Sequence, residues 1–224
     1  MENFFPALAT SPLFAGIAAA DFAALLACLG ASVKTYKKGE IIYFEGDAAA
    51  GIGLVVKGRL HLVKGDIRGN NSLVAEVTPP ETFAEAVVCG GIGRVPVGVV
   101  AREDSGIMFL DYGKIAAGCP SACAFHSRLI RNIIGVLARK NILLLERVEH
   151  VAKRTTGEKL LSYLAERAKR TGGGPFEIPF NRQELADYLF VERSALSAEM
   201  GRLKSRGIIK YRKNRFELIG EAEP

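Results

Sequence analysis

The sequence predicts an α+β fold in which an antiparallel β domain is followed by a long helix and a small C-terminal domain. Three patterns predict it. Between residues 31 and 112, short apolar segments alternate with glycine and proline, as in the short strands of a sandwich or barrel. Between residues 130 and 151, apolar residues recur every seven positions. Beyond residue 180, two short amphipathic segments separated by a break precede a pair of basic strand-like segments.

The composition is that of a folded protein, and its charge is unevenly distributed. Hydrophobic residues make up 49% of the 224 positions and charged residues 24%, which excludes a disordered or fibrous chain. Basic residues number 15 against 14 acidic ones in 1–150, and 15 against 10 in 151–224, so the last third carries +5 of the net charge of +6. A basic C-terminal segment on a nearly neutral body suggests that this segment meets a polyanion.

Several classes of protein are excluded by what the sequence lacks. No apolar stretch approaches the roughly 18 residues needed to span a bilayer, and no basic residue precedes the apolar N-terminus as in a secretory signal. Four cysteines do not make a disulfide scaffold. We therefore expect a cytoplasmic protein with free thiols and no membrane partner. Because the sequence contains no nucleophile elbow, paired metal-ligand motif or nucleotide loop, we expect neither an enzyme nor a cofactor.

The N-terminal region is expected to contain one helix followed by strands. Residues 11–29 are rich in alanine and leucine, which favours a helix, and Asp21 is placed to cap it. From residue 31 to 112, apolar segments separated by turn residues follow one another at about ten-residue spacing. This spacing predicts an antiparallel sandwich or barrel.

Residues 120–151 are expected to form one long helix. Its apolar residues fall into two seven-residue series: Ile130, Leu137, Leu144 and Val151, and Ile134, Asn141 and Val148. With the second series at a positions and the first at d, they form a coiled-coil seam of about three heptads. A helix packed on its own domain would show a similar period. The polar Asn141 favours a parallel homodimer, because an a-position asparagine can pair with its symmetry mate. The predicted interface contains Ile130, Ile134, Leu137, Asn141 and Leu144.

The segment 181–218 has the pattern of a helix-turn-helix with a wing. Asn181, followed by Glu184, resembles a capping box, and it opens a short helix with an apolar face. After a break at 190–192, a second helix is expected to begin near Arg193, with four residues facing inward: Ala195, Leu196, Met200 and Leu203. Two strands at 208–211 and 215–218 then make a wing with basic residues at its tip. Before these elements, 156–170 is expected to be helical as well.

These segments resemble transcription regulators of the CRP/FNR family. The matching segments are SPLFAGI, KKGEIIYFEGD, VVKGRLHLV, FNRQELADYL and RSALSAEM, and they occur in the family's order over nearly the whole chain. The resemblance implies an effector-sensing jelly-roll domain of the cyclic-nucleotide-binding type at 1–119, a dimerisation helix at 120–151 and a winged helix-turn-helix DNA-binding domain at 152–224. It further implies double-stranded DNA, a second copy of the chain and RNA polymerase as partners.

The resemblance also implies which residues meet DNA. Arg182 and Gln183 match positions that bind the phosphate backbone, which suits an exposed helix N-terminus. Arg193 and Ser194 match positions that enter the major groove, where arginine can reach guanine O6 and N7. Ser197 lies one turn further along the same face. The remaining candidates for phosphate contacts are basic residues of the second helix and the wing: Lys204, Arg206, Lys210, Arg212 and Lys213.

Two departures from the family pattern lie in this segment. Ala198 stands where the family usually has a second base-reading arginine, and Phe190 stands in the turn where it usually has glycine. A bulky aromatic residue adopts the backbone angles of such a turn only with strain. We therefore expect DNA binding with an unusual operator or reduced affinity.

The effector pocket departs further from the family. Cyclic-nucleotide binders carry Gly-Glu and, about nine residues later, Arg-Ser, because the cyclic phosphate needs a guanidinium and the ribose a carboxylate. The aligned residues here are Ala84-Glu85 and Val95-Pro96, and Arg94 is displaced by one position, which on a strand would face the other way. We therefore expect a pocket near Phe83, Glu85, Val95 and Pro96 that does not bind cyclic AMP and holds a less charged molecule or nothing.

Two alternatives stay open at this stage. In the first alternative, Cys119 and Cys123, four residues apart, could form a redox pair. The three histidines, His61, His126 and His150, could ligate haem or a metal. The simpler interpretation of each of these residues is an ordinary packed side chain. The chain would then be a redox or haem sensor. It could also be a dimeric ligand-binding protein with weakened DNA binding. Phe190 and Ala198 favour this alternative, because both depart from the family's DNA-binding pattern.

Overall fold

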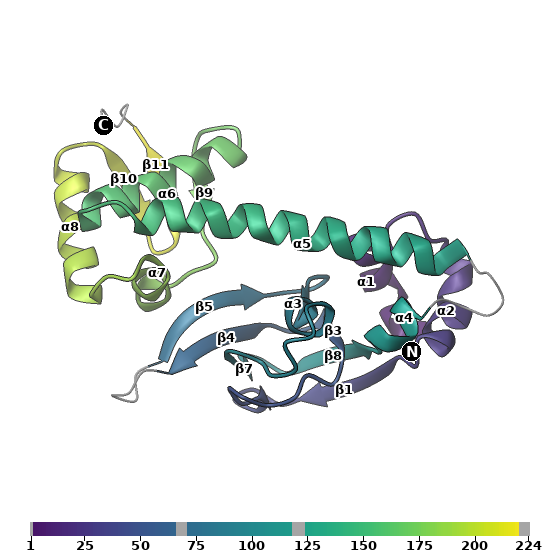
Figure 1. Cartoon of the computed structure of the whole chain (residues 1–224). Helices are drawn as coiled ribbons and strands as arrows, with labels where there is room; N and C mark the ends of the chain where they lie inside the picture. The colour runs from purple at the N-terminus through teal and green to yellow at the C-terminus, as the bar shows by residue number, and fades with distance from the viewer. Residues whose placement is uncertain (1, 66–70, 118–123, 220–224) are drawn as a thin grey trace. The chain divides into compact units, whose positions relative to one another are not determined.

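The computed structural model describes residues 2–65, 71–117 and 124–219. The chain divides into two compact units, Met1–Lys140 and Asn141–Pro224, and each is described by itself. Figure 1 shows the order of the elements along the chain. The predicted α+β fold is confirmed, with an N-terminal β domain, a long helix and C-terminal helices that include a helix-turn-helix.

The first unit begins with short helical segments instead of the expected helix over 11–29. These segments are η1 (Glu2–Phe4), α1 (Phe5–Thr10), η2 (Pro12–Phe14), η3 (Ala19–Asp21) and α2 (Phe22–Cys28). Gly16 adopts a φ of 73°, which interrupts a helix, and the Asp21 side chain makes no capping hydrogen bond. The prediction of one helix capped by Asp21 was therefore wrong.

Two four-stranded antiparallel sheets form the β domain, as the strand spacing predicted. One sheet has the order β1 (Ser32–Tyr36), β8 (Ser105–Leu110), β3 (Ile52–Lys57) and β6 (Thr82–Phe83). The other has the order β2 (Ile41–Tyr43), β7 (Gly98–Ala101), β4 (Leu60–Gly65) and β5 (Asn71–Val77). The short helix α3 (Glu85–Cys89) follows β6, and α4 (Tyr112–Ala116) follows β8.

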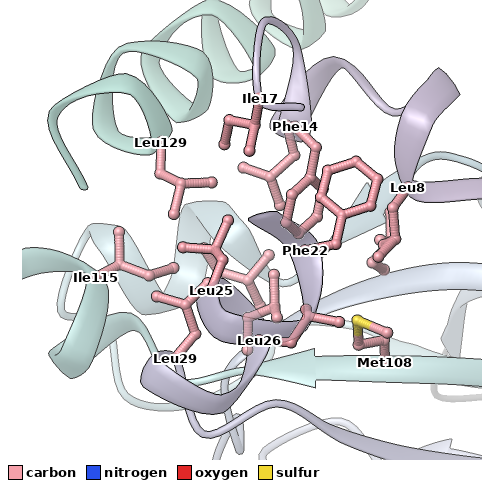
Figure 2. Packing of buried hydrophobic residues seen from close by; sticks show 14 of the residues in the cluster. Leu8, Phe14, Ile17, Phe22, Leu25, Leu26, Leu29, Met108, Ile115 and Leu129 are labelled. Atoms are coloured by element: carbon pink, nitrogen blue, oxygen red, sulfur yellow. The ribbon is translucent and has the colours of Figure 1, made fainter. Parts of the chain in front are cut away.

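Two apolar clusters stabilise this unit. The first joins the N-terminal helical segments to β3, β8 and the start of α5 (Ala124–Val151), and Figure 2 shows Phe14, Phe22 and Leu129 within it. The second fills the space between the sheets with residues such as Leu60 and Phe109. Full burial of one such side chain contributes about 1.5–3 kcal/mol. The clusters therefore fix the strands that carry the predicted effector residues.

The second unit contains the last part of α5, then α6 (Thr156–Arg170), β9 (Phe176–Glu177), α7 (Arg182–Leu189), α8 (Arg193–Ser205), β10 (Ile209–Arg212) and β11 (Arg215–Leu218). The strands form a small antiparallel sheet in the order β10-β11-β9 (Figure 1). The helices predicted over 156–170 and from Arg193 and the two strands of the wing are confirmed. Within the described ranges, no helix is both long and apolar enough to cross a membrane.

Candidate DNA-binding and effector sites

The start of α7 is fixed by the predicted capping box. Asn181 Oδ1 accepts hydrogen bonds from the backbone amides of Gln183 at 2.9 Å and Glu184 at 3.0 Å. Glu184 Oε2 in return accepts from the Asn181 amide at 2.8 Å. These three bonds satisfy amides that a helix start leaves free, so the first turn of α7 has one defined orientation.

The turn between α7 and α8 contains the strained residue that the sequence predicted. Phe190 adopts φ 52° and ψ 55°, in the left-handed region, and its side chain is 60% exposed. The Val191 amide donates to the Ala186 carbonyl at 3.0 Å and thereby closes the end of α7. Such angles cost a residue with a side chain about 1–2 kcal/mol.

The N-terminal part of α8 presents three predicted DNA-contacting side chains to solvent. Arg193, Ser194 and Ser197 are exposed, and Ala198 is exposed on the next position. Leu196, Met200 and Leu203 are buried against the rest of the unit, as expected. Ala195 was expected to face inward and is exposed instead, because it lies about 100° around the helix from the face shared by Leu196, Met200 and Leu203.

Arg182 lies against the wing. Its guanidinium is 5.2 Å from the centre of the Tyr211 ring, and it contacts Met200 Sδ. The same ring lies 5.3 Å from Lys204 Nζ. Tyr211 therefore holds two cations that come from α7 and α8. This role of Tyr211 was not predicted, because Arg182, Lys204 and Tyr211 belong to three separate elements.

The other predicted phosphate contacts lie at the surface. Gln183 is exposed, and its Nε2 donates to Asp187 Oδ1 at 2.8 Å. Lys213 is exposed in the turn between β10 and β11, where it adopts a φ of 55°. Asn214 beside it is bonded to the backbone of Ile178 at 3.2 Å through its side chain and at 3.0 Å through its carbonyl. These two bonds anchor the wing turn to the segment that follows β9.

Phe83, the first of the predicted effector-pocket residues, is buried in an aromatic cluster. Its ring centre lies 6.3 Å from those of both Tyr43 and Phe109, and each pair is arranged edge to face. Thr82 beside it is buried, and its Oγ1 has no hydrogen-bond partner among the described residues. A buried hydroxyl in this position has an open capacity to bond a ligand or water.

Glu85, the second of these residues, is buried with 3% of its surface exposed. It follows Ala84, which adopts a φ of 62° at the position where the family usually has glycine. Glu85 Oε1 lies 2.5 Å from Lys140 Nζ of α5, and Lys140 also donates to the Thr82 carbonyl at 2.5 Å. The buried carboxylate is therefore paired with a cation from the long helix. The pairing of Glu85 with Lys140 was not predicted, because the two residues are far apart in the sequence.

Val95 and Pro96, the last two pocket residues, differ in exposure. Val95 is buried in the cluster between the sheets, whereas Pro96 is exposed. Arg94 is exposed, and its guanidinium donates to the Gly46 carbonyl at 2.7 Å. Arg94, the basic residue next to the position of the family's phosphate-binding arginine, is thus bound to the backbone of a surface turn.

The α5 face that carries the predicted seam is largely exposed in the single chain. Ile134 is 62% and Leu144 59% exposed, and Asn141 is also exposed. Ile130 is exposed to a smaller degree, and Leu137 packs partly on the N-terminal cluster. Val148, the next a position of the seam, is exposed as well, and three further exposed apolar residues lie beside the seam on α5: Ile142, Leu143 and Leu145.

The residues considered for redox or metal chemistry are dispersed. Cys119 and Cys123 lie outside the described residues. His126 Nε2 is 3.9 Å from Cys28 Sγ. His61 bonds Glu76 at 3.2 Å, and His150 bonds Ser162 at 2.8 Å and Glu166 at 3.2 Å. The described part of the chain contains no group of three potential metal ligands.

Comparison with known families agrees with this arrangement. The cyclic nucleotide-binding domain family matches residues 33–119, and the Crp-like helix-turn-helix domain family matches residues 158–222. A search of the curated proteins finds no match.

Solved structures share the fold at low sequence identity. FixK2 from Bradyrhizobium japonicum is 19% identical, with 85% of this chain and 93% of that chain covered and a TM-score of 0.62. The c-di-GMP responsive global regulator CLP from Xanthomonas campestris is 15% identical, with 91% and 100% covered and a TM-score of 0.69. A CRP/FNR family transcriptional regulator from Thermus thermophilus is 18% identical, with 84% and 94% covered and a TM-score of 0.57.

One class of DNA-binding regulators is defined by three parts in this order: a β domain of the cyclic-nucleotide-binding type, a long helix, and a helix-turn-helix domain with a wing. The two family matches together cover more than half of the sequence and occur in the order that this class requires. The chain belongs to the CRP/FNR family of transcription regulators.

Proposed function

We propose that the protein is a homodimeric, sequence-specific regulator that reads DNA with the N-terminal part of α8. The observation that carries this proposal is the exposed row Arg193, Ser194 and Ser197 on a helix whose opposite face is buried. Arginine at such a position can bond guanine O6 and N7, and the two serine hydroxyls can bond either base edges or phosphates.

Arg182, Gln183 and Lys213 are proposed to contact the phosphate backbone around that helix. Lys213 and Gln183 are exposed. The Arg182 guanidinium is held on the Tyr211 ring beside Lys204, which concentrates positive charge between the two helices and the wing. Phosphate contacts of this kind position the protein on the duplex and make its affinity dependent on salt.

We propose that dimerisation uses the exposed face of α5. A soluble monomer rarely exposes a large apolar surface, and four apolar residues of the predicted seam are exposed on α5: Ile130, Ile134, Leu144 and Val148. Ile130, Ile134, Leu137 and Leu144 would form the apolar contacts, and Asn141 would pair with its counterpart and fix the register. In functional terms, residues 1–119 would sense the effector, 120–151 would dimerise and 152–224 would bind DNA.

The effector is proposed to be a small molecule other than cyclic AMP. Val95 lies in the core, Pro96 carries no donor and Arg94 is engaged with Gly46, so the phosphate of a cyclic nucleotide would lack its guanidinium. The buried hydroxyl of Thr82 and the Glu85 carboxylate would offer hydrogen bonds to a less charged molecule.

DNA binding is tested with duplexes that the wild-type protein selects from a random pool. We expect log affinity to fall linearly with log salt, and Arg193→Ala to weaken binding by about 1–3 kcal/mol while relaxing the preference at one base pair. Arg139→Ala removes the same charge from the exposed surface of α5 and serves as the control. A protein that selects no duplex, or that binds every duplex equally, would refute the proposal.

The exclusion of cyclic AMP is tested by calorimetric titration of the full chain. We expect no heat of binding at micromolar concentrations of cyclic AMP. Saturable binding in that range would show that the pocket satisfies the cyclic phosphate by groups other than the missing arginine, and the exclusion would be wrong.

A further inference from the structure

Arg147 is a buried cation in the last two turns of α5. Only 9% of its surface is exposed, and burial lowers the pKa of its guanidinium. Neighbouring residues Val148 and Glu149 on the same helix are exposed, so Arg147 lies on the face that packs within the second unit. A long charged side chain is rarely buried in this way unless it makes specific polar contacts.

The Arg147 guanidinium binds the C-terminal end of α7. Its Nε and Nη2 both donate to the Tyr188 carbonyl, at 3.2 and 3.1 Å. This carbonyl belongs to the last turn of α7, where helix carbonyls lack an intrahelical partner and where the helix dipole favours a cation. The contact therefore holds the end of the first helix of the helix-turn-helix.

The same guanidinium also stacks on the turn that follows. Its Cζ lies 4.3 Å from the centre of the Tyr188 ring and 5.1 Å from that of Phe190. Tyr188 is itself held by the ring of Phe180, whose centre is 4.8 Å away. Phe190 is the left-handed residue of the turn, three positions before Arg193. Arg147 thus contacts both the helix end and the strained turn that set the direction of α8.

We propose that Arg147 is a positioning residue for DNA recognition, which acts through Phe190 to hold α8 in the orientation that reads bases. This inference rests on the proposed DNA-binding function. It also gives a physical reason for the aromatic residue in a turn where glycine would be free of strain. The ring of Phe190 supplies a stacking surface for the guanidinium, and glycine cannot.

Arginine is required for this role because two of its features are used at once. Its planar guanidinium lies over the rings of Tyr188 and Phe190 while two nitrogens of the same group bind one carbonyl. Lysine offers a compact ammonium that cannot do both in this geometry. Arg147→Lys is therefore the variant that keeps the charge and loses the positioning.

The test compares four variants of the full chain: Arg147→Ala, Arg147→Lys, Phe190→Ala and the double variant Arg147→Ala/Phe190→Ala. Arg139→Ala is the charge-matched control on the exposed surface of α5. Each is measured against a duplex that the wild type selects from a random pool and against an unrelated duplex, over a range of salt. Thermal unfolding reports whether each variant folds, and Phe190→Ala changes an exposed side chain that is outside the core.

We expect Arg147→Ala and Phe190→Ala each to weaken binding to the selected duplex by about tenfold, and Arg147→Lys by several-fold. Binding to the unrelated duplex and the salt dependence should change by less than about twofold, because the phosphate contacts remain. The double variant should lose no more than the stronger single variant, because both substitutions remove one interaction.

Three results would overturn the inference. One is wild-type affinity of Arg147→Ala for the selected duplex. A second is a loss of affinity in the double variant that equals the product of the losses in the two single variants. The third is a parallel loss on both duplexes, which would indicate a structural role alone. These outcomes differ from a failure of the proposed function, in which the wild type and the Arg139→Ala control would themselves select no duplex.

Discussion

Individual residues decide how this member differs from the family to which it belongs. Three residues other than glycine adopt a positive φ in the described part of the chain: Ala84, Phe190 and Lys213. Ala84 and Phe190 stand at positions where the family pattern has glycine, and both adopt backbone angles that glycine reaches without strain. In both cases the side chain stands next to a predicted site, Glu85 in one and α8 in the other.

Replacing Phe190 separates backbone strain from side-chain stacking. Phe190→Ala keeps the strained backbone and removes the ring, whereas Phe190→Gly removes both. We expect Phe190→Gly to be more stable than Phe190→Ala by about 1 kcal/mol, because relief of about 1–2 kcal/mol of strain exceeds the added flexibility of the unfolded chain. Equilibrium denaturation measures the difference. A Phe190→Gly variant that is less stable than Phe190→Ala by the cost of a more flexible unfolded chain, about 0.4–1 kcal/mol, would mean that the turn carries no strain.

Ala198 offers a test of the missing base contact. Ala198→Arg adds a guanidinium to the exposed face of α8, one turn after Ser194. We expect the variant to select a different duplex and to bind it about 1–3 kcal/mol more tightly than the wild type binds its own. Ser205→Arg adds the same charge at the far end of α8 and is the control. An equal gain from both variants on all duplexes would indicate a purely electrostatic effect.

The sequence predicts the residues of this site better than their contacts. The family resemblance assigned Arg193 and Ser194, and helical spacing added Ser197 one turn further along the same face; all three are exposed, and their contact with DNA stays a prediction. The stacking of Arg182 on Tyr211 joins residues from two separate elements, and no local pattern reports such a pair. The same holds for Lys140 with Glu85. Contacts across elements depend on packing, which periodicity does not encode.

At the scale of elements, end signals were more reliable than composition. The capping box at Asn181 correctly predicted the start of α7. The alanine- and leucine-rich composition of 11–29 instead predicted a single helix, which Pro12 and Gly16 divide into short segments. Helix propensity is a weak preference, and a glycine in the left-handed region overrides it.

The capping box of α6 makes a prediction about pH. Glu158 Oε2 accepts the Thr155 amide at 2.9 Å, and hydrogen bonds from Thr155 lower the pKa of the Glu158 carboxyl. A carboxyl whose pKa is lowered by folding stabilises the folded state above its unfolded-state pKa, and that contribution disappears as the pH falls through the folded-state pKa. Between about pH 6 and about pH 3, the wild type should therefore lose more thermal stability than Glu158→Gln.

Thermal unfolding of both proteins across this pH range measures the difference. Glu149→Gln removes an exposed glutamate of α5 and controls for the loss of one negative charge. Parallel curves for the wild type and Glu158→Gln would show that the capping box adds nothing to acid sensitivity.

The exposed face of α5 makes a prediction about assembly. Leu144→Lys places a charge in the middle of the proposed seam, where each of the two symmetry-related leucines would contribute about 1.5–3 kcal/mol of apolar burial. We expect this variant to sediment as a monomer at micromolar concentration and the wild type as a dimer. Glu149→Lys, an exposed change outside the seam, should remain dimeric. Sedimentation of the wild type itself as a monomer would contradict the coiled-coil interpretation.

For the whole molecule, the uneven distribution of net charge along the sequence nearly coincides with the boundary between the two compact units. The +5 of residues 151–224 lies within the second compact unit, which contains the helix-turn-helix and the wing. The first 150 residues carry +1. A ligand that is a polyanion should therefore bind, and stabilise, the second unit selectively.

Differential scanning calorimetry of the full chain can measure this selectivity. Because the contacts of the chain cluster in two units, we expect two unfolding transitions. A selected duplex at 100 times its dissociation constant adds about 2.7 kcal/mol to the unit that binds it, which raises the midpoint of a domain this small by on the order of 10 °C. The transition of the second unit should move by this amount and that of the first should not. High salt should abolish the shift, because it weakens the phosphate contacts, whereas an equal shift of both transitions would mean that the units unfold as one.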